Sequence, residues 1–219
     1  MVMVCGIDEA GRGPILGPLV MAGILTDDNG VEELKRIKVR DSKLLTAEQR
    51  EDLFGQIIRI VKDYKILIIN PAEIDASVNS NDGMNLNWLE ARKAAEILNF
   101  LNPDRAIVDC PSPNIAAYRA FLMNMVANKK MEAVVEHKAD VNWAAVSAAS
   151  ILAKVTRDAE IEKLKAAVAE DFGSGYLHDP KTIAFFEKHF ESFPDVFRKS
   201  WTPYKNKVFA KSQRKLGNY

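Results

Sequence analysis

The chain has 219 residues, of which 47% are hydrophobic and 27% are charged, and its formal net charge at pH 7 is zero. Such a composition is typical of one sizeable globular domain, with room for a small C-terminal appendage. No apolar run reaches the roughly 18 residues of a membrane span, and no basic residues precede the first apolar stretch as they do in a secretory signal. We therefore expect a cytoplasmic protein that does not bind membranes.

Strands and helices alternate from the N-terminus onward. Alternating apolar residues predict strands over residues 2–8 and 19–25, joined by the Gly- and Pro-rich stretch GRGPILGP. Thr46, with Gln49 three residues later, predicts a capping box at the start of a helix that continues to residue 64. The next expected elements are a strand at 65–70, a short helix at 71–78 and a long helix at 85–101.

The second half of the chain continues the same alternation. It predicts a short buried strand at 106–110, a helix at 114–126, a strand at 131–136 and a long helix at 143–169. After a Gly-Ser-Gly break, a further helix begins at Asp179 or Pro180 and continues to about Phe190. This alternation indicates an α/β fold.

Four acidic residues stand where predicted strands end. Asp8 and Glu9 end the first strand, Asp109 ends the strand at 106–110, and Asp140 follows the strand at 131–136. Each acid taken alone is more often a solvated residue or a helix cap. Together they suggest one site, because functional groups gather at strand ends in α/β sheets. Clustered carboxylates repel one another. A divalent cation such as Mg²⁺ takes carboxylate oxygens as ligands, and its positive charge relieves that repulsion.

The adjacent pair Asp8 and Glu9 poses a geometric difficulty. Regular strand alternation sends two neighbouring side chains to opposite faces of a sheet. We therefore expect the strand to lose its pleat at Ala10-Gly11, so that both carboxylates can approach the same ions. Two ions about 4 Å apart would hold both sides of an in-line phosphoryl displacement.

Charge is unevenly distributed along the chain. From residue 198 to the C-terminus there are seven basic residues and no acidic ones, so this segment carries +7 and the remainder −7. A basic arm beside an acidic body suits a protein that binds a polyanion and holds cations in its active site. The alternative is a solubilising, disordered tail.

The two cysteines, Cys5 and Cys110, are too few for a disulfide framework and have no zinc-ligand spacing. We expect two reduced, buried thiols. The sequence alone leaves open whether the two form a disulfide bridge.

Six blocks in order resemble ribonuclease HII in its archaeal form, which is related to the catalytic subunit of eukaryotic ribonuclease H2. They are GIDEAGRGPILGPLV from Gly6, DSKLL at 41–45, IVDCP at 107–111, HKAD at 137–140, SAASILAKVTRD at 147–158 and GSGY at 173–176. Two blocks depart from the common family pattern. Tyr176 is followed by Leu177-His178, where many members have proline after the tyrosine, and the stretch VDCPSPN differs after its aspartate. Neither departure removes a catalytic group.

The resemblance implies an α/β, RNase H-like mixed sheet flanked by helices, with a catalytic domain at 1–175 and a C-terminal helical extension with a basic tail at 176–219. It implies hydrolysis of RNA in RNA/DNA hybrids and of single ribonucleotides embedded in duplex DNA, leaving 5′-phosphate and 3′-hydroxyl ends. From the same resemblance we expect two Mg²⁺ or Mn²⁺ ions in each active site, and we expect the protein to be a monomer.

The family's four acids fall on Asp8, Glu9, Asp109 and Asp140, which would act as metal ligands and catalytic residues. Asp8 would bridge both ions, Glu9 and Asp109 would hold one, and Asp140 the other. None of the three histidines is required by this scheme.

Substrate contacts are expected at other positions. The family's Gly11-Arg12-Gly13 element directly follows the acids, and glycine lets backbone groups approach a ribose 2′-hydroxyl closely. The resemblance assigns Tyr176 to the RNA-to-DNA junction, whereas a loop tyrosine alone is more often a packing residue. Lys43 and Lys154 are weaker candidates for phosphate contacts.

The C-terminal lysines and aromatics allow two interpretations. Lys205, Lys207 and Lys211, interleaved with aromatic residues, could track the DNA backbone. Equally, the aromatics could dock the extension onto the body of the protein.

Two rival functions were weighed. A metal-dependent phosphatase or resolvase would also use clustered acids, but Asp8-Glu9-Ala10 lacks the DxD pattern of aspartate phosphatases, and a resolvase would cut all-DNA junctions. A non-catalytic nucleic-acid-binding subunit would keep the basic tail and lose acids, and all four acids are present.

Overall fold

The structure is a computed structural model that describes residues 2–39, 45–81 and 83–216. Lys43 lies outside these residues. The chain forms two compact units. We call Met1–Ala10, Val20–Ile68 and Asn87–Arg157 the sheet unit, and Gly11–Leu19, Ile69–Leu86 and Asp158–Tyr219 the loop unit. The division expected after residue 175 stays a prediction.

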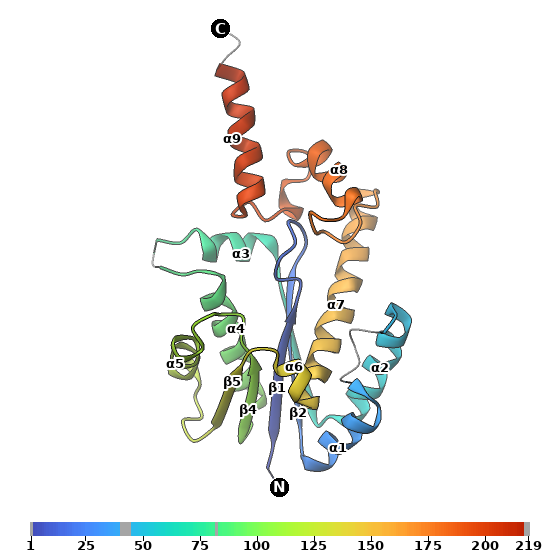
Figure 1. The fold of residues 1–219 in the computed structure, drawn as a ribbon, viewed down its shortest axis with the longest axis vertical. Coiled ribbons are helices and arrows are strands. Elements are labelled where there is room, and N and C mark those ends of the chain that lie inside the picture. The colour runs from blue at the N-terminus through green and yellow to red at the C-terminus, as the bar shows by residue number, and fades with distance from the viewer. Residues whose placement is uncertain (1, 40–44, 82, 217–219) are drawn as a thin grey trace. The chain divides into compact units, whose positions relative to one another are not determined.

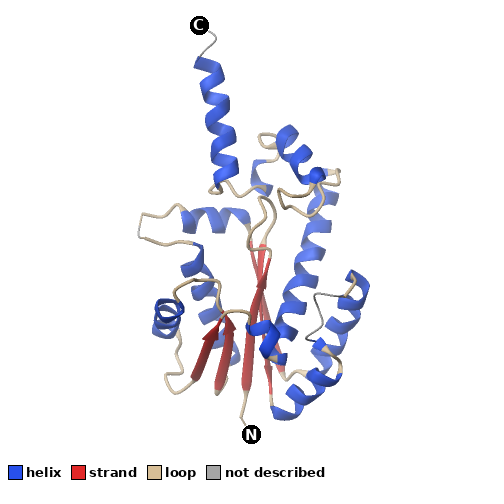
Figure 2. Ribbon diagram, in the orientation of Figure 1, coloured by secondary structure: helices blue, strands red, loops and turns tan. Residues whose placement is uncertain are grey.

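A five-stranded mixed sheet with the order β3-β2-β1-β4-β5 forms the centre of the sheet unit (Figures 1 and 2). The strands are β1 (Val4–Ala10), β2 (Leu19–Thr26), β3 (Asp63–Ile69), β4 (Arg105–Asp109) and β5 (Glu132–Glu136). β1 pairs antiparallel with β2 and parallel with β4, and β4 pairs parallel with β5. The expected mixed sheet is confirmed.

Two glycines let helices approach opposite faces of this sheet. A Cβ on Gly6 would overlap the backbone of Ala145 in α7 (Ala144–Val168), and a Cβ on Gly23 would overlap the side chain of Ile97 in α4 (Leu86–Leu101). Gly23 pairs with Ile7, the residue after Gly6, so the two glycines face opposite sides of the sheet. The N-terminal part of α7 therefore covers one face and α4 covers the other (Figure 1).

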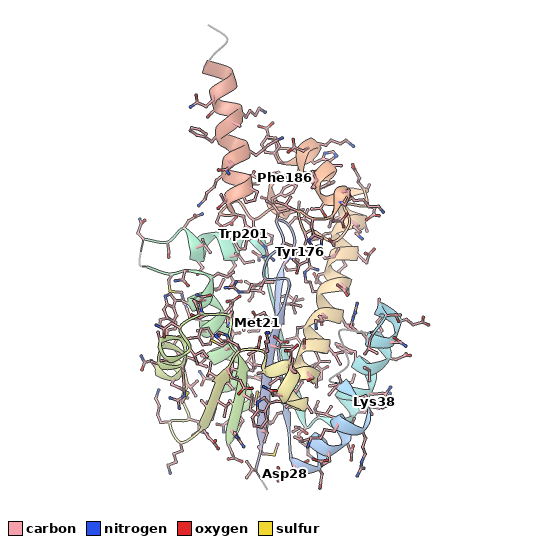
Figure 3. The ribbon with its side chains drawn as sticks, in the orientation of Figure 1. Met21, Asp28, Lys38, Tyr176, Phe186 and Trp201 are labelled. Atoms are coloured by element: carbon pink, nitrogen blue, oxygen red, sulfur yellow. The ribbon has the colours of Figure 1, made fainter. Side chains whose placement is uncertain are left out.

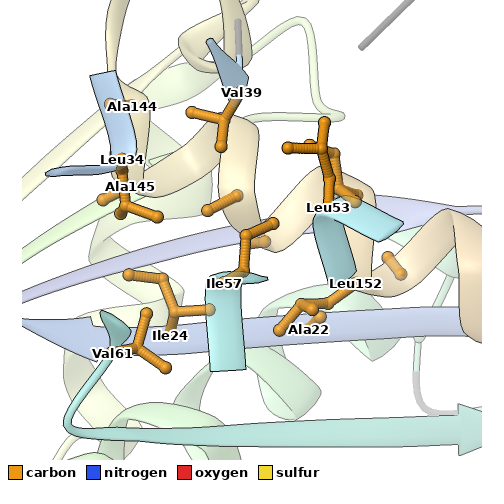
Figure 4. Packing of buried hydrophobic residues seen from close by; sticks show 14 of the residues in the cluster. Ala22, Ile24, Leu34, Val39, Leu53, Ile57, Val61, Ala144, Ala145 and Leu152 are labelled. Atoms are coloured by element: carbon orange, nitrogen blue, oxygen red, sulfur yellow. The ribbon is translucent and has the colours of Figure 1, made fainter. Parts of the chain in front are cut away.

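The apolar core on the α7 face also draws in α1 (Asp28–Arg36) and α2 (Ala47–Ile60) (Figure 4). Its buried members include Ile24, Leu34, Leu53, Ile57 and Leu152. Each such side chain contributes about 1.5–3 kcal/mol when fully buried. The small residues at the start of α7 allow this close packing.

The capping box before α2 is confirmed: the Gln49 N–H donates to Thr46 Oγ1 at 3.2 Å, and the Thr46 N–H donates to Gln49 Oε1 at 2.9 Å. α2 ends at Ile60, earlier than expected, because β3 already begins at Asp63. α1 was not expected from the sequence. Its N-terminus is capped by Asp27, whose side chain accepts a hydrogen bond from the Gly30 N–H at 2.9 Å.

The other expected helices are present, together with a short α-helix and a 3₁₀ helix that the sequence did not predict. The sheet unit contains α5 (Ile115–Met125) and the short, unpredicted α6 (Ala139–Asn142). The loop unit contains α3 (Pro71–Val78), α8 (Pro180–His189), a 3₁₀ helix (Pro194–Val196) and α9 (Thr202–Leu216). None of the helices in the described ranges is both long and apolar enough to cross a bilayer.

The loop unit has its own aromatic core. Phe172, Phe185, Phe186, Phe197 and Tyr204 are buried together. Ile15 and Leu16 from the connection between β1 and β2 join the same cluster. This core places the stretch after β1 against the C-terminal segment, where Figure 3 labels Tyr176, Phe186 and Trp201.

Candidate active site

Asp8 is a buried carboxylate on the sheet face that α7 covers. It is 7% exposed, and its Oδ1 accepts a hydrogen bond from the Glu9 N–H at 2.7 Å. Burial raises the pKa of Asp8 to about 7, and the charges of Asp109 and Asp140 raise it further, against the lowering effect of the Ser150 hydroxyl and the Glu9 N–H. The charged form of Asp8 is therefore disfavoured in the chain alone, because these two hydrogen bonds do not offset its burial.

Asp109 stands beside Asp8 at the end of β4. Val108 pairs with Ile7 in parallel register, so the next residues, Asp109 and Asp8, come to the same face of the sheet. Asp109 Oδ1 accepts a hydrogen bond from the Ala139 N–H at 2.7 Å. Through this bond the end of β4 fixes the start of α6, which carries Asp140.

Asp140 lies in the first turn of α6, and the junction between α6 and α7 holds it there. The Ser147 hydroxyl donates to the Asp140 carbonyl and lies 3.1 Å from the Trp143 carbonyl. The charge of Asp140 contributes to the raised pKa of Asp8. The structure thus brings three of the four expected acids to one end of the sheet.

Glu9 lies on the opposite face from Asp8. β1 stays regularly paired with β2 as far as Ala10, which pairs with Val20, so the expected loss of pleat at Ala10-Gly11 is wrong. The Glu9 carboxylate is still close to the end of β4. The pKa of the Cys110 thiol is raised mainly by burial, and the charges of Asp109 and Glu9 add to this effect.

We tested this set of residues for its fit to a metal. Within residues 2–39, 45–81 and 83–216, no three His, Cys, Asp or Glu side chains are grouped so as to hold a metal ion in this conformation. The donor chemistry nevertheless fits a divalent cation, because all four side chains offer carboxylate oxygens. The raised pKa of Asp8 reflects first its burial and then the charges of Asp109 and Asp140, and a bound cation would favour the charged carboxylate against all of these. Binding would require Asp8, Asp109 and Asp140 to turn toward one another and the Glu9 carboxylate to reach them around the end of β1.

Both cysteines are free and buried, as expected. Burial raises the pKa of the Cys5 thiol, so it stays protonated and inert near neutral pH.

Lys154 lies on α7 one helical turn after Ser150, and it is half-buried. Residues four apart share a helix face, so Lys154 is on the side of α7 whose Ser150 hydroxyl acts on Asp8. This position suits the expected phosphate contact, which stays a prediction.

In the loop unit, two expected substrate-binding elements come together. Gly11 has φ +81°, a left-handed conformation that favours glycine, and it opens the Gly11-Arg12-Gly13 turn. The Tyr176 ring lies against Gly13, with Cε1 3.6 Å from the position that a Cβ there would take. The Ile15 N–H donates to the Gly175 carbonyl at 2.9 Å, which joins the two loops.

Sequence reasoning missed Arg198, which it counted only as one base of the tail. The Arg198 side chain is fully buried and donates hydrogen bonds to the carbonyls of Gly11, Arg12 and Gly17. The one signal in the sequence was its place directly after Phe197 and close to Trp201, two aromatic residues that could bury its side chain.

Three lysines of α9 have partners within the loop unit. The Lys205 ammonium donates to Asn79 Oδ1 at 3.2 Å. Lys207 and Lys211 form ion pairs with Glu187 and Glu191. Tyr204 is buried in the aromatic core, whereas Phe209 is 64% exposed. Tyr204 thus supports the docking interpretation.

Comparisons with known proteins identify the family. The family model described as ribonuclease HII matches residues 5–204. A ribonuclease HII from Pyrococcus furiosus is 47% identical over 200 residues, covering 90% of this chain and 87% of that protein. One from Thermococcus kodakarensis is 43% identical over 203 residues, covering 90% of this chain and 86% of that protein.

Solved structures agree with this result. The crystal structure of ribonuclease H2 from Pyrococcus horikoshii matches with a TM-score of 0.83 at 40% identity, covering 93% of this chain and 96% of that chain. The structure of the PCNA:RNase HII complex from Archaeoglobus fulgidus matches with a TM-score of 0.83 at 36% identity, covering 92% and 96%. An RNase HIII in complex with Mn²⁺, at 21% identity and a TM-score of 0.76, shares the fold.

The matched residues include all four strand-end acids, the Gly11-Arg12-Gly13 turn and Tyr176. Enzymes of this kind depend on divalent metals, which agrees with the oxygen donors at the end of the sheet. The chain therefore belongs to the ribonuclease HII family of hydrolases, which cleave the RNA of RNA/DNA hybrids.

Proposed function

We propose that this protein hydrolyses RNA/DNA hybrids and also single ribonucleotides embedded in duplex DNA, using two Mg²⁺ or Mn²⁺ ions and leaving 5′-phosphate and 3′-hydroxyl ends. The observation that carries the proposal is the buried Asp8 carboxylate, whose pKa is raised to about 7 by burial and by its neighbours Asp109 and Asp140. Burial disfavours the charged form of this carboxyl, and a nearby positive charge favours it. A bound cation would supply that positive charge.

Asp8 would hold both ions, Glu9 and Asp109 one of them, and Asp140 the other. Bound there, the ions would lower the pKa of the attacking water and neutralise charge on the departing 3′ oxygen. Asp109 has a second role in this scheme, because its bond to the Ala139 N–H sets the position of α6 and hence of Asp140. Lys154 would contact a phosphate, and Lys43 is proposed for the same role from its place in the DSK motif.

Backbone groups of Gly11-Arg12-Gly13 would detect the 2′-hydroxyl, which both donates and accepts hydrogen bonds. In the chain this turn is separated from Glu9 by Ala10 alone. Tyr176, which lies against Gly13, would stack on the sugar or base at the RNA-to-DNA step. We further propose that the protein acts as a cytoplasmic monomer.

One incubation tests the proposal. A duplex DNA with a single embedded ribonucleotide is incubated with the enzyme, with and without Mg²⁺ or Mn²⁺, and the cut site and end groups are mapped. We expect metal-dependent cleavage beside the ribonucleotide with a 3′-hydroxyl on the upstream fragment. An all-DNA junction serves as the control, because cleavage of it would favour a resolvase. Binding without cleavage in either metal would instead indicate a non-catalytic subunit.

A further inference from the structure

Arg198 is a buried cation of the loop unit that the metal chemistry does not use. Its guanidinium donates to the carbonyls of Gly11 (2.6 Å from Nη2), Arg12 (2.7 Å from Nη1) and Gly17 (3.1 Å from Nε). Its Cζ also lies 5.0 Å from the centre of the Trp201 ring. A buried charged side chain needs hydrogen-bond partners, and here one loop supplies three of them, one for each guanidinium nitrogen.

These bonds fix the orientation of two consecutive peptide groups. A trans peptide is planar, so the N–H that follows each carbonyl points the opposite way. The carbonyls of Gly11 and Arg12 face the guanidinium, and the N–H groups of Arg12 and Gly13 therefore face away from it. The left-handed φ of Gly11, +81°, belongs to the same turn. A donor with a fixed direction is what a site needs to recognise a hydroxyl without reorganising.

The backbone around Arg198 is itself held from two sides. The Asp75 carboxylate in α3 accepts hydrogen bonds from the N–H groups of Lys199 and Ser200, each at 2.8 Å, and from the Ser200 hydroxyl at 2.5 Å. The Arg198 N–H donates to the Ile15 carbonyl at 2.8 Å. Asp75 thus fixes the turn that carries Arg198, and Arg198 fixes the glycine turn.

We propose that Arg198, anchored by Asp75, is a positioning residue that orients the Gly11-Arg12-Gly13 peptides and thereby sets the preference for ribose over deoxyribose. This inference rests on the proposed function of that turn. Arginine is required because its planar fork reaches three carbonyls at once, whereas the single ammonium group of lysine cannot span them.

The test measures ribose preference rather than activity alone. Arg198→Lys and Asp75→Ala are each combined with Asp109→Asn, which removes turnover. The dissociation constants are then measured for a duplex with one ribonucleotide and for the all-deoxy duplex of the same sequence. We expect the ratio of the two constants to fall by up to about tenfold in Arg198→Lys, as for the loss of one oriented hydrogen bond between a backbone N–H and the 2′-hydroxyl, and by a smaller factor in Asp75→Ala.

Lys199→Gln is the matched control, since it alters the same turn but leaves the Lys199 N–H bond to Asp75 in place. Its ratio should equal that of the Asp109→Asn parent. Thermal unfolding establishes that each variant is folded, and if Arg198→Lys is not, Asp75→Ala decides alone.

The inference would be overturned if the ratio of the two dissociation constants stayed unchanged in a folded variant. This includes a variant that weakens binding of both duplexes equally, because Arg198 would then serve stability only. Cleavage by the wild-type enzyme distinguishes a failure of the inference about Arg198 from a failure of the proposed function. If the wild type cleaves the all-deoxy duplex as readily as the ribonucleotide-containing one, the ribose-reading function itself is refuted, and the role of Arg198 in it as well.

Discussion

Asp8 links the stability of the protein to its metal content. Its pKa lies at about 7 against an ordinary value of 3.8, chiefly because burial penalises the charged carboxylate. Between these pH values the folded chain retains the proton on Asp8, whereas the unfolded chain has already lost it. The folded state is therefore progressively destabilised as the pH rises through this window. A gap of about three pH units corresponds to about 4 kcal/mol at most.

Asp8→Asn removes this penalty, because the amide has no charge to desolvate. We expect the metal-free variant to be more stable than the metal-free wild type at pH 8, by up to about 4 kcal/mol or about 8–16 °C in Tm for a chain of this size. Near pH 4 the difference should nearly vanish, since Asp8 is then protonated in the folded wild type. Titrating groups other than Asp109 and Asp140, which interact with Asp8, affect both proteins alike and cancel in the comparison.

The assay is thermal unfolding in a chelating buffer between pH 4 and pH 8, followed by addition of Mg²⁺ at pH 8. The added ion should raise the Tm of the wild type more than that of Asp8→Asn, because binding to the folded state stabilises it. If the two metal-free proteins differ by the same amount at pH 4 and pH 8, the uncompensated charge on Asp8 does not exist and the reasoning fails.

Three further outcomes are expected. Asp109→Asn should abolish turnover while leaving hybrid binding largely intact in a mobility-shift assay, and a fully active, metal-dependent variant would refute its assignment. Gly6→Ala should lower the free energy of unfolding in urea by about 1–3 kcal/mol or more, because its Cβ would overlap the Ala145 backbone. Replacing both Lys207 and Lys211 with alanine should change the salt slope of binding by well under two units, since both already form ion pairs with Glu187 and Glu191. A decrease of about two would show that they contact phosphates.

Much of the fold could be predicted because its signals are local. The capping box at Thr46 and the first strand each depend on a few neighbouring residues. The capping box is confirmed, and the strand forms two residues later than predicted, at Val4–Ala10 instead of 2–8. α1 was missed because Asp28-Asn29-Gly30 has the composition of a turn, and only the Asp27 cap and the burial of Leu34 make a helix of it.

The candidate site divides in the same way. Strand ends identify Asp8, Asp109 and Asp140 from the sequence, since topology alone brings such ends together. Asp8 and Glu9 lie on opposite faces because β1 stays paired with β2 as far as Ala10. The sequence suggested otherwise, because Gly11 follows directly and could have interrupted the strand. Arg198 could not be assigned locally, because its partners Gly11 and Arg12 lie nearly the whole chain away.

Asp8 and Arg198 show how the same physical cost leads to different roles. Both are charged groups removed from water, and each needs compensation for lost hydration. Three backbone carbonyls within the protein accept hydrogen bonds from Arg198 and compensate its lost hydration. The same bonds hold the loop that carries these carbonyls. Asp8 is buried with two further acids nearby, its hydrogen bonds from Ser150 and the Glu9 N–H offset this only in part, and its pKa rises. A bound cation would supply the missing compensation, and for this reason we propose the end of β1 as the place where cations bind.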